Sequence, residues 1–135
     1  MNNNFEPGSI EYAKNIIGCD PFATFLGIKV EHAEENYCKC SLVLEPHHLN
    51  ALERIHGSVV CSMCDQVMAV AANTQGRRAL SLSMSINFIG SALCGERIIS
   101  EAVPVNISNK ISVWHVEVKS NDKVIASGNV TAYHK

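Results

Sequence analysis

The segment from residue 57 to residue 74 constrains the fold more than any other part of the chain. Its apolar side chains, from Val59 to Ala72, cover nearly the whole circumference of a helix. A helix that is apolar on all sides is buried inside a protein. At about 1.5 Å per residue, a central helix over about residues 57–74 is roughly 27 Å long. Asp65, Gln66 and Asn73 interrupt it, so we do not expect it to span a membrane.

The rest of the chain is dominated by strand patterns. Two segments precede the helix and four follow it, at residues 28–32, 37–44, 79–89, 96–106, 110–120 and 123–133. Short links between consecutive strands favour antiparallel neighbours, and Pro104 predicts an edge or a bulge. A curved antiparallel sheet of five to six strands, wrapped around the one long central helix, would bury that helix. The fold class is therefore predicted to be α+β.

Two short helical turns are predicted ahead of the sheet. Ser9 is a good cap and Gly18 a good stop, which predicts a short helix over about residues 9–17. Asp20 followed by Pro21 marks a second start, and Gly27 ends that turn. With 135 residues, the chain is predicted to form a single domain, 1–135.

The charge balance narrows the choice of partners. Charged residues make up 18% of the chain, against about 25% in typical proteins, which suggests that another subunit covers part of the surface. The net charge of −2 gives no electrostatic footprint for a nucleic acid. The first eight residues lack the features of a secretory signal, and no apolar run is long enough for a membrane span. We expect a cytoplasmic protein.

Six cysteines lie at positions 19, 38, 40, 61, 64 and 94. In a cytoplasm they are expected to be reduced thiols. The Cys38-x-Cys40 and Cys61-x-x-Cys64 spacings are compatible with zinc. Both pairs also lie in strongly apolar periodic segments, where cysteine serves as a small buried hydrophobe, and this interpretation is favoured. His47 and His48 have no third ligand at a useful spacing, so no metal site is expected.

Asp65 is the most informative residue, because it lies about two turns from either end of the apolar helix. It is too far inside the helix to act as a cap, and burying an unpaired carboxylate costs several kcal/mol. Three interpretations stay open: a functional carboxylate facing a cleft, a buried carboxylate satisfied by its neighbours, or a stripe that faces water. The stripe in question consists of small or polar residues at helical spacing: Ser58, Ser62, Asp65, Gln66, Ala69 and Asn73.

The start of the helix offers a different chemistry. A helix N-terminus presents free N–H groups and the positive end of the helix dipole, and Gly57 lets a substrate oxygen approach the backbone closely. Such a group can polarise a carbonyl without a charged side chain. For the preceding His56, a capping or core histidine is the simpler interpretation.

Distance decides how Gly57 and Asp65 could act together. They are eight residues apart, about 12 Å along a helix, while catalysis requires contacts of about 3 Å. Either they act separately, or Gly57 of one chain faces Asp65 of another. Two antiparallel helices around a two-fold axis would bring the two groups together twice per dimer. This interpretation predicts composite sites at a subunit interface.

The residues around the helix start resemble those of the hotdog-fold acyl-CoA thioesterases, in the phenylacetate-pathway (PaaI-type) branch. That family shows Asn-x-x-Gly-x-x-His-Gly-Gly, followed by an Asp nine residues after the His. The matching positions here are Asn50, Glu53, His56, Gly57, Ser58 and Asp65. Further similarity lies in the strand at 81–88, the turn at 95–96 and the strand at 124–128, and the resemblance covers about residues 20–134.

The resemblance implies a role for each matching residue. Asp65 would act as nucleophile or general base on a thioester, and the Gly57 N–H would polarise the thioester carbonyl. Asn50, from the same chain as Gly57, would position the carboxylate or the water. His56 would shape the loop and contact the region of the acyl sulfur, and Ser81, from the chain of Asp65, would lie near the attacking water.

The same resemblance implies the partners. The substrate would be an acyl-CoA, so CoA arrives as part of the substrate and no cofactor or metal is needed. The assembly would be a homodimer with shared active sites that pairs further into a dimer of dimers, or homotetramer. Glu53, Ser58 and Ser91 depart from the family's usual Gly, Gly and Pro. Ser58 would narrow the site or add a donor, so it belongs with the substrate contacts.

Cationic side chains are needed to hold the phosphates of CoA. Arg77, Arg78 and Lys110 are the candidates, with Arg54 and Arg97 behind them; exposed solubilising charge is the alternative for each. An apolar acyl pocket has its own candidates, for each of which core packing is the alternative: Phe22, Phe25, Met63, Met84 and Phe88.

Two further functions compete with hydrolysis. A hydratase of enoyl thioesters on the same scaffold resembles a pattern with a His a few residues after its Asp, and residues 66–72 contain no His. A non-catalytic acyl-CoA binding module would have no need of Asp65. The sequence therefore favours a thioester hydrolase.

Overall fold

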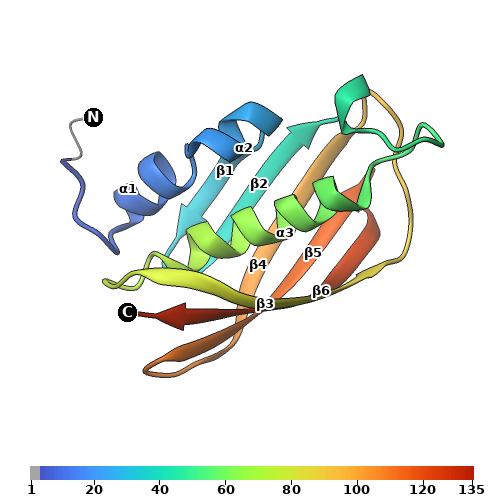
Figure 1. Cartoon of the computed structure of the whole chain (residues 1–135). Coiled ribbons are helices and arrows are strands. Elements are labelled where there is room, and N and C mark those ends of the chain that lie inside the picture. The colour runs from blue at the N-terminus through green and yellow to red at the C-terminus, as the bar shows by residue number, and fades with distance from the viewer. Residues whose placement is uncertain (1–3) are drawn as a thin grey trace.

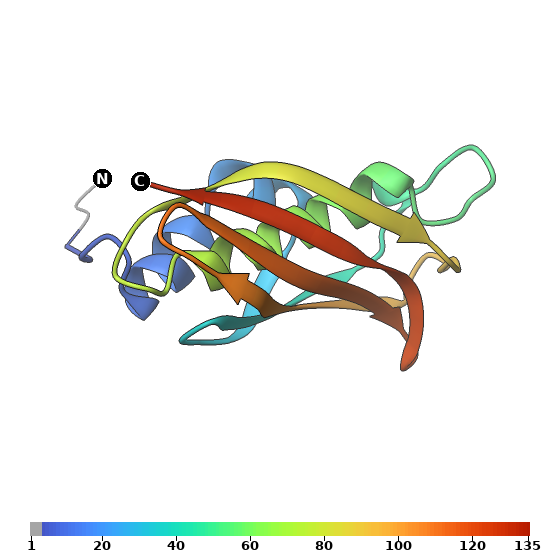
Figure 2. The ribbon, with the colours of Figure 1, turned by 90° about the horizontal axis from the view of Figure 1, so that it is seen from below.

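The computed structural model describes residues 4–135. Within them, six strands form one antiparallel sheet in the order β1-β2-β4-β5-β6-β3. Figure 1 shows helix α3 lying along the concave face of this sheet, and Figure 2 shows the strands curving beneath it. The strands are β1 (Lys29–Glu34), β2 (Tyr37–Val43), β3 (Ala79–Phe88), β4 (Arg97–Ile107), β5 (Ile111–Ser120) and β6 (Lys123–His134).

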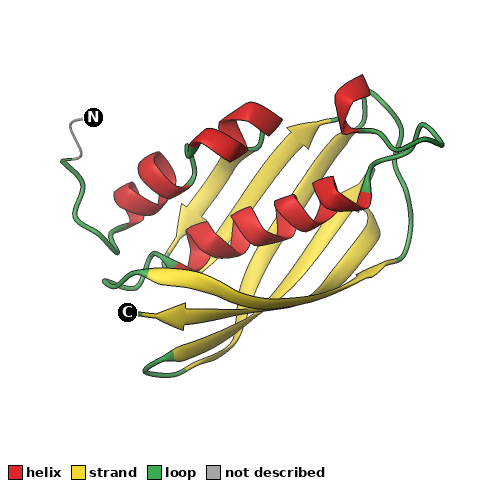
Figure 3. Ribbon diagram, viewed as in Figure 1, coloured by secondary structure: helices red, strands yellow, loops and turns green. Residues whose placement is uncertain are grey.

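The helices lie on one side of the sheet (Figure 3). Ser9 caps α1 by accepting the Tyr12 N–H, and Asp20 caps α2 by accepting the Ala23 N–H at 2.8 Å. Gly27 ends α2 with a φ of 89°, a left-handed conformation that suits glycine. The helical segments are α1 (Ile10–Tyr12), the π-helical turn η1 (Ala13–Ile17), α2 (Pro21–Leu26), the 3₁₀ turn η2 (Pro46–His48) and α3 (Gly57–Ala72).

The central helix ends at Ala72, two residues before the predicted end. The Asn73 side chain stops it by donating to the Ala69 carbonyl at 2.7 Å and accepting the Ala79 N–H at 3.0 Å. These bonds turn the chain directly into β3. The prediction that Asn73 belongs to a cleft-facing stripe is wrong, because its amide is buried and occupied by the backbone.

The core lies between α3 and the inner face of the sheet. Met63, Val67 and Val70 of α3 are fully buried there, as are Ile98 of β4 and Trp114 of β5. Along β5 every second residue is buried, the period expected for a strand with one face on the core. Of the two interpretations given for Met63, core packing is therefore the one that the structure confirms.

Strand β4 has the irregularity that Pro104 predicts. Its pairing with β5 shifts register between Pro104 and Asn106, while its pairing with β2 stops at Ala102. The proline therefore lies where no β2 carbonyl needs its missing N–H.

The two edges of the sheet are β1 and β3. Strand β3 is paired with β6 on one side only, and a Cβ on Gly128 of β6 would lie 2.0 Å from the Ser85 oxygen. Glycine is therefore required for the close contact of these strands. Leu80, Leu82 and Phe88 of β3 are each more than half exposed. No helix in residues 4–135 has the length and apolar character needed to cross a membrane.

Candidate active site

One stripe of α3 reaches the surface while the other sides of the helix are buried. Its members are small or polar and follow helical spacing: Gly57, Ser58, Cys61, Ser62, Asp65 and Ala69. Gln66 belongs to the buried side, because its Nε2 donates to the Ile17 carbonyl at 2.8 Å. Compared with the predicted stripe, the observed one lacks Gln66 and Asn73 and includes Gly57 and Cys61.

Asp65 lies on this stripe, half-buried, and bonds to one side chain of β3. The Ser81 hydroxyl donates a hydrogen bond to Asp65 Oδ1. Among residues 4–135, Asp65 makes no ion pair. Of the three interpretations left open by the sequence, that of a buried carboxylate is therefore wrong, because Asp65 is only half-buried. Asp65 presents a carboxylate at a partly open surface, oriented by Ser81.

The first turn of α3 leaves one backbone donor free. His56 caps the helix, with its Nδ1 accepting the Ser58 N–H at 2.9 Å. The N–H groups of Val59 and Val60 both bond to the His56 carbonyl. Within residues 4–135, the Gly57 N–H has no acceptor. It is a fixed donor at the positive end of a helix, able to bind a developing oxyanion.

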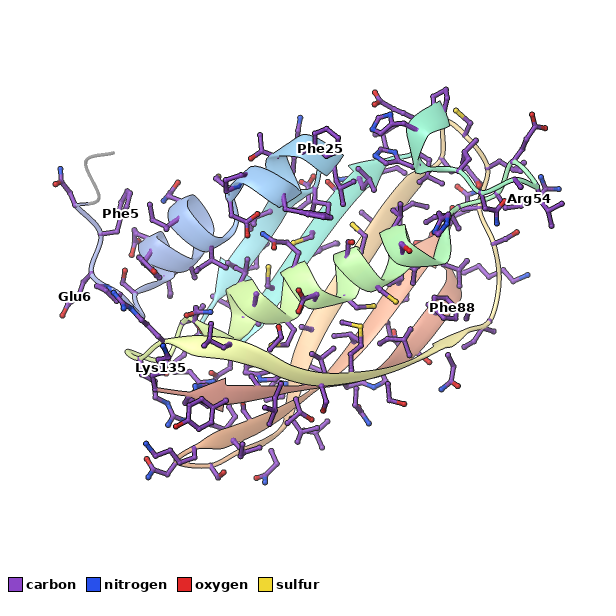
Figure 4. All side chains as sticks on the ribbon, viewed as in Figure 1. Phe5, Glu6, Phe25, Arg54, Phe88 and Lys135 are labelled. Carbon is purple, nitrogen blue, oxygen red and sulfur yellow. The ribbon has the colours of Figure 1, made fainter. Side chains whose placement is uncertain are left out.

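Asn50 shapes the loop that leads into α3. Its Oδ1 accepts the N–H groups of Leu52 and Arg54 at 2.9 and 3.1 Å. The turn thus formed holds Glu53 at a φ of 60°, in the left-handed region. This is the position where the related pattern has glycine, so the chain keeps the loop shape although the residue differs. Arg54 lies at the tip of the loop (Figure 4).

Gly57 and Asp65 remain separated within one protomer. Both lie on α3, eight residues apart, which corresponds to about 12 Å. One carbonyl carbon cannot contact both groups of the same chain. A Cβ at Gly57 would meet the Phe88 ring at 3.5 Å, an ordinary contact, so glycine is not required there by packing.

The profile of a family described as the thioesterase superfamily matches residues 52–127. The chain belongs to this family. A putative esterase of Archaeoglobus fulgidus is 34% identical over 115 residues, covering 84% of this chain and 75% of that protein. Acyl-coenzyme A thioesterase PaaI of Escherichia coli is 25% identical over 108 residues, covering 79% and 77%.

Solved structures agree with the family assignment. A variant of the phenylacetic acid degradation protein PaaI from Thermus thermophilus is 30% identical, with a TM-score of 0.83 over 86% of this chain and all of that chain. The E. coli PaaI protein, at 21% identity, shares the fold with a TM-score of 0.89, covering 95% of this chain and 94% of that chain. The predicted hotdog fold and PaaI-type resemblance are confirmed.

In this thioesterase the three leading cationic candidates, Arg77, Arg78 and Lys110, lie toward the other end of α3, whereas Arg54 precedes α3 and Arg97 forms an ion pair with Glu31 at 2.9 Å. The Arg77 guanidinium donates to the carbonyls of Ser108, at 2.7 Å, and Asn109, so it ties the β4–β5 turn to the start of β3. Lys110 Nζ lies 6.0 Å from the centre of the Tyr133 ring. Arg78 is exposed. A phosphate contact by Arg77 would compete with two carbonyls, which the sequence could not reveal.

Beside Asp65 lies a pocket of about 310 Å³ between α2 and α3. Asp65, Ser62 and Gln66 of α3 form one wall, and Phe22 with Ala23 of α2 forms another. Asp20, the cap of α2, and Ile28 complete it. Phe22 is the one predicted acyl-pocket residue that lines this pocket; Phe25, Met84 and Phe88 do not. The sequence analysis assigned Asp20 only a capping role.

Proposed function

We propose that this protein hydrolyses acyl-CoA thioesters to the free acid and CoA. The observation that carries the proposal is the unoccupied Gly57 N–H at the start of α3, on the same exposed stripe as the Asp65 carboxylate. One group stabilises negative charge on a carbonyl oxygen, and the other supplies a base or nucleophile. The names of relatives such as E. coli acyl-coenzyme A thioesterase PaaI support the choice of substrate class.

In the proposed reaction the thioester carbonyl oxygen accepts the Gly57 N–H. The Asp65 carboxylate either removes a proton from the attacking water or attacks the carbonyl carbon itself, forming an anhydride that water then hydrolyses. The C–S bond breaks, the acid is released, and CoA leaves as a thiol after it takes up a proton. No metal or cofactor is needed for these steps, and CoA enters as part of the substrate.

The site is composite in this proposal. Since Gly57 and Asp65 of one chain are about 12 Å apart, the N–H that serves Asp65 comes from the partner's α3. Strand β3 is paired on one side only, and its Leu80 and Leu82 side chains are exposed. These features support an isologous contact in which two β3 edges pair and the two α3 helices run antiparallel. The homodimer would hold two such sites and pair further into a tetramer.

The other site residues position these groups. Ser81 orients Asp65 and lies beside the attacking water. Asn50 and His56, from the chain of Gly57, hold the loop and the helix start. Ser58 is exposed next to Gly57, within reach of the same substrate. Arg78 and Lys110 are proposed to contact the phosphates of CoA, with Arg77 joining them where its carbonyl bonds allow.

The decisive experiment removes one hydrogen-bond donor without changing the fold. Gly57 is the first residue of α3, a position that favours proline, and the preceding His56 has an extended conformation (φ −71°, ψ 138°) that proline requires. Gly57→Pro deletes the N–H, whereas Gly57→Ala keeps it and adds a Cβ. We expect Gly57→Pro to lower kcat about 100- to 1000-fold, and Gly57→Ala to stay within about fivefold of the wild type.

The carboxylate is tested in parallel. Asp65→Asn keeps the shape and the bond to Ser81, and we expect it to lower kcat by at least about 100-fold. Activity is followed by thiol release from short-chain, long-chain and aryl acyl-CoAs, and by the absorbance of crotonyl-CoA, which would reveal a hydratase. Full activity of Asp65→Asn, or equal activity of Gly57→Pro and Gly57→Ala, would refute the proposed site.

A further inference from the structure

The pocket between α2 and α3 is lined by residues beyond those that the proposed thioester hydrolysis requires. It adjoins Asp65 directly, so a group attached to the reacting carbonyl carbon can enter it. Its volume of about 310 Å³ lies at the low end of the range for small-molecule pockets, about 300–1000 Å³. Space next to the reacting atom is therefore limited to a compact group.

The walls of the pocket are fixed in place. The Gln66 side chain bonds to the Ile17 carbonyl at 2.8 Å, which holds the segment before α2 against α3. His48 Nε2 donates to the Leu26 carbonyl at 2.8 Å, which holds the end of α2. These two bonds anchor the chain on both sides of Phe22, so the backbone that carries this ring is held beside the pocket.

The charged residues that line the pocket are both acidic. Asp20 and Asp65 both line it, and none of its described lining residues is Lys, Arg or His. The Asp20 carboxylate uses Oδ1 to cap α2 and makes no ion pair within residues 4–135. Lys14 and Lys29 line a different hollow. A carboxylate on an entering acyl group would be repelled by both aspartates and would find no cationic partner among these lining residues.

We infer that this pocket receives the acyl group and selects compact acyl groups without a negative charge, with Asp20 rejecting carboxylated groups and Phe22 limiting their size. This inference rests on the proposed thioesterase function. It assigns two specificity-determining residues, Phe22 in α2 and Asp20 as the cap of α2, and neither α2 nor its cap carries a group proposed to react. The substrate class is thus an uncharged, compact acyl-CoA.

The charge arm of the test compares butyryl-CoA with succinyl-CoA, which have the same four-carbon chain and differ by a terminal carboxylate. Asp20→Asn removes the charge and keeps the cap, because asparagine caps helices as well as aspartate does. The ratio of kcat/KM for succinyl-CoA to that for butyryl-CoA should rise about three- to tenfold, and the rise should shrink at high salt. Asp122→Asn, in the β5–β6 turn, is the matched control and should leave the ratio unchanged.

The size arm uses two exposed phenylalanines of the same helix. Phe22 is 55% exposed and lines the pocket, while Phe25 is 78% exposed and does not line it. In Figure 4, Phe25 stands on the outer side of α2. Phe22→Ala should raise the octanoyl-CoA to butyryl-CoA ratio of kcat/KM at least about fivefold, and Phe25→Ala should not change it.

The outcomes distinguish a failure of the inferred selectivity from a failure of the proposed hydrolase function. A wild-type enzyme that prefers succinyl-CoA, or unchanged ratios in both Asp20→Asn and Phe22→Ala, would overturn the inference while the hydrolase function stands. No hydrolysis of any acyl-CoA by the wild type would overturn the proposed function itself. Circular dichroism of each variant confirms that ratios are compared between folded proteins.

Discussion

Cys61 offers a direct measurement of the proposed dimer. If Gly57 of one helix lies level with Asp65 of an antiparallel partner, then two residues are level when their numbers add up to 122. Cys61 is the residue that satisfies this sum with its own copy, so the two Cys61 thiols should meet on the two-fold axis. Cys61 is half-buried, lies on the stripe of α3 that reaches the surface, and is not in a disulfide.

The separation can be worked out for any position on the stripe. Packed helix axes lie about 8–10 Å apart and Cα atoms about 2.3 Å from each axis, so facing Cα atoms come within about 3.5–5.5 Å. A disulfide needs about 4.4–6.8 Å, which the Cys61 pair can meet. For two Ser58 residues the axial offset is about 9 Å, six residues at about 1.5 Å each, which is too far.

The assay is oxidation with copper-phenanthroline followed by non-reducing electrophoresis. Cys19 and Cys94 are exposed, so both are first replaced by serine. Burial raises the pKa of the Cys61 thiol, so cross-linking should quicken as the pH is raised above 8. We expect a linked dimer that disappears in Cys61→Ser and is not restored when Ser58→Cys is added to that variant.

Two results would contradict the proposed register. The first is cross-linking that is the same with and without Cys61. The second is cross-linking through Ser58→Cys as efficient as through Cys61, because both cannot be level with their own copies in one antiparallel pair.

Three other predictions concern the site and the stability of the fold. Co-folding Asp65→Asn chains with Gly57→Pro chains should restore activity, since the mixed dimer contains one intact site; sites made from a single chain would show no recovery. Glu53→Gly should raise the free energy of unfolding by about 1 kcal/mol, because Glu53 adopts a left-handed conformation that glycine adopts without strain. Urea denaturation measures this free energy, and an unchanged or lower value would contradict the prediction. Burial and the nearby Arg77 lower the pKa of His134, so the unfolded chain binds the proton more readily and the free energy of unfolding should fall as the pH drops below about 6.5. His134→Gln should weaken this dependence of the free energy of unfolding on pH, as urea denaturation at several pH values would measure. An equally steep dependence in the variant would refute the assignment to His134.

Most helices and strands of this fold can be predicted from the sequence, because the spacing of their apolar residues follows the period of a helix or a strand. The apolar pattern predicts α3 from Gly57 onward, and the strand pattern over residues 110–120 predicts β5. The predicted end of α3 lies two residues too late because Asn73 stops the helix through a side-chain bond to Ala79, at the start of the next strand. Such a contact leaves no periodic signal.

The candidate site likewise contains residues that the sequence can predict and residues whose place depends on packing. Asp65, Gly57 and Ser81 could be nominated because spacing along one helix and one family pattern connect them. Arg77 could not be assigned, since the carbonyls it binds lie 31 and 32 residues away in the chain. Asp20 has a sufficient local explanation as a cap, and its place in the pocket depends on how α2 packs against α3.

The proposed pairing of two β3 edges would make catalysis depend on the concentration of the protein. If half of each reaction centre belongs to a different molecule, an isolated copy is folded but inert. Specific activity would then depend on dilution: it would be constant at high concentration and decline in direct proportion once the molecules separate. A cell could silence such an enzyme by keeping it scarce, without degrading or chemically altering it.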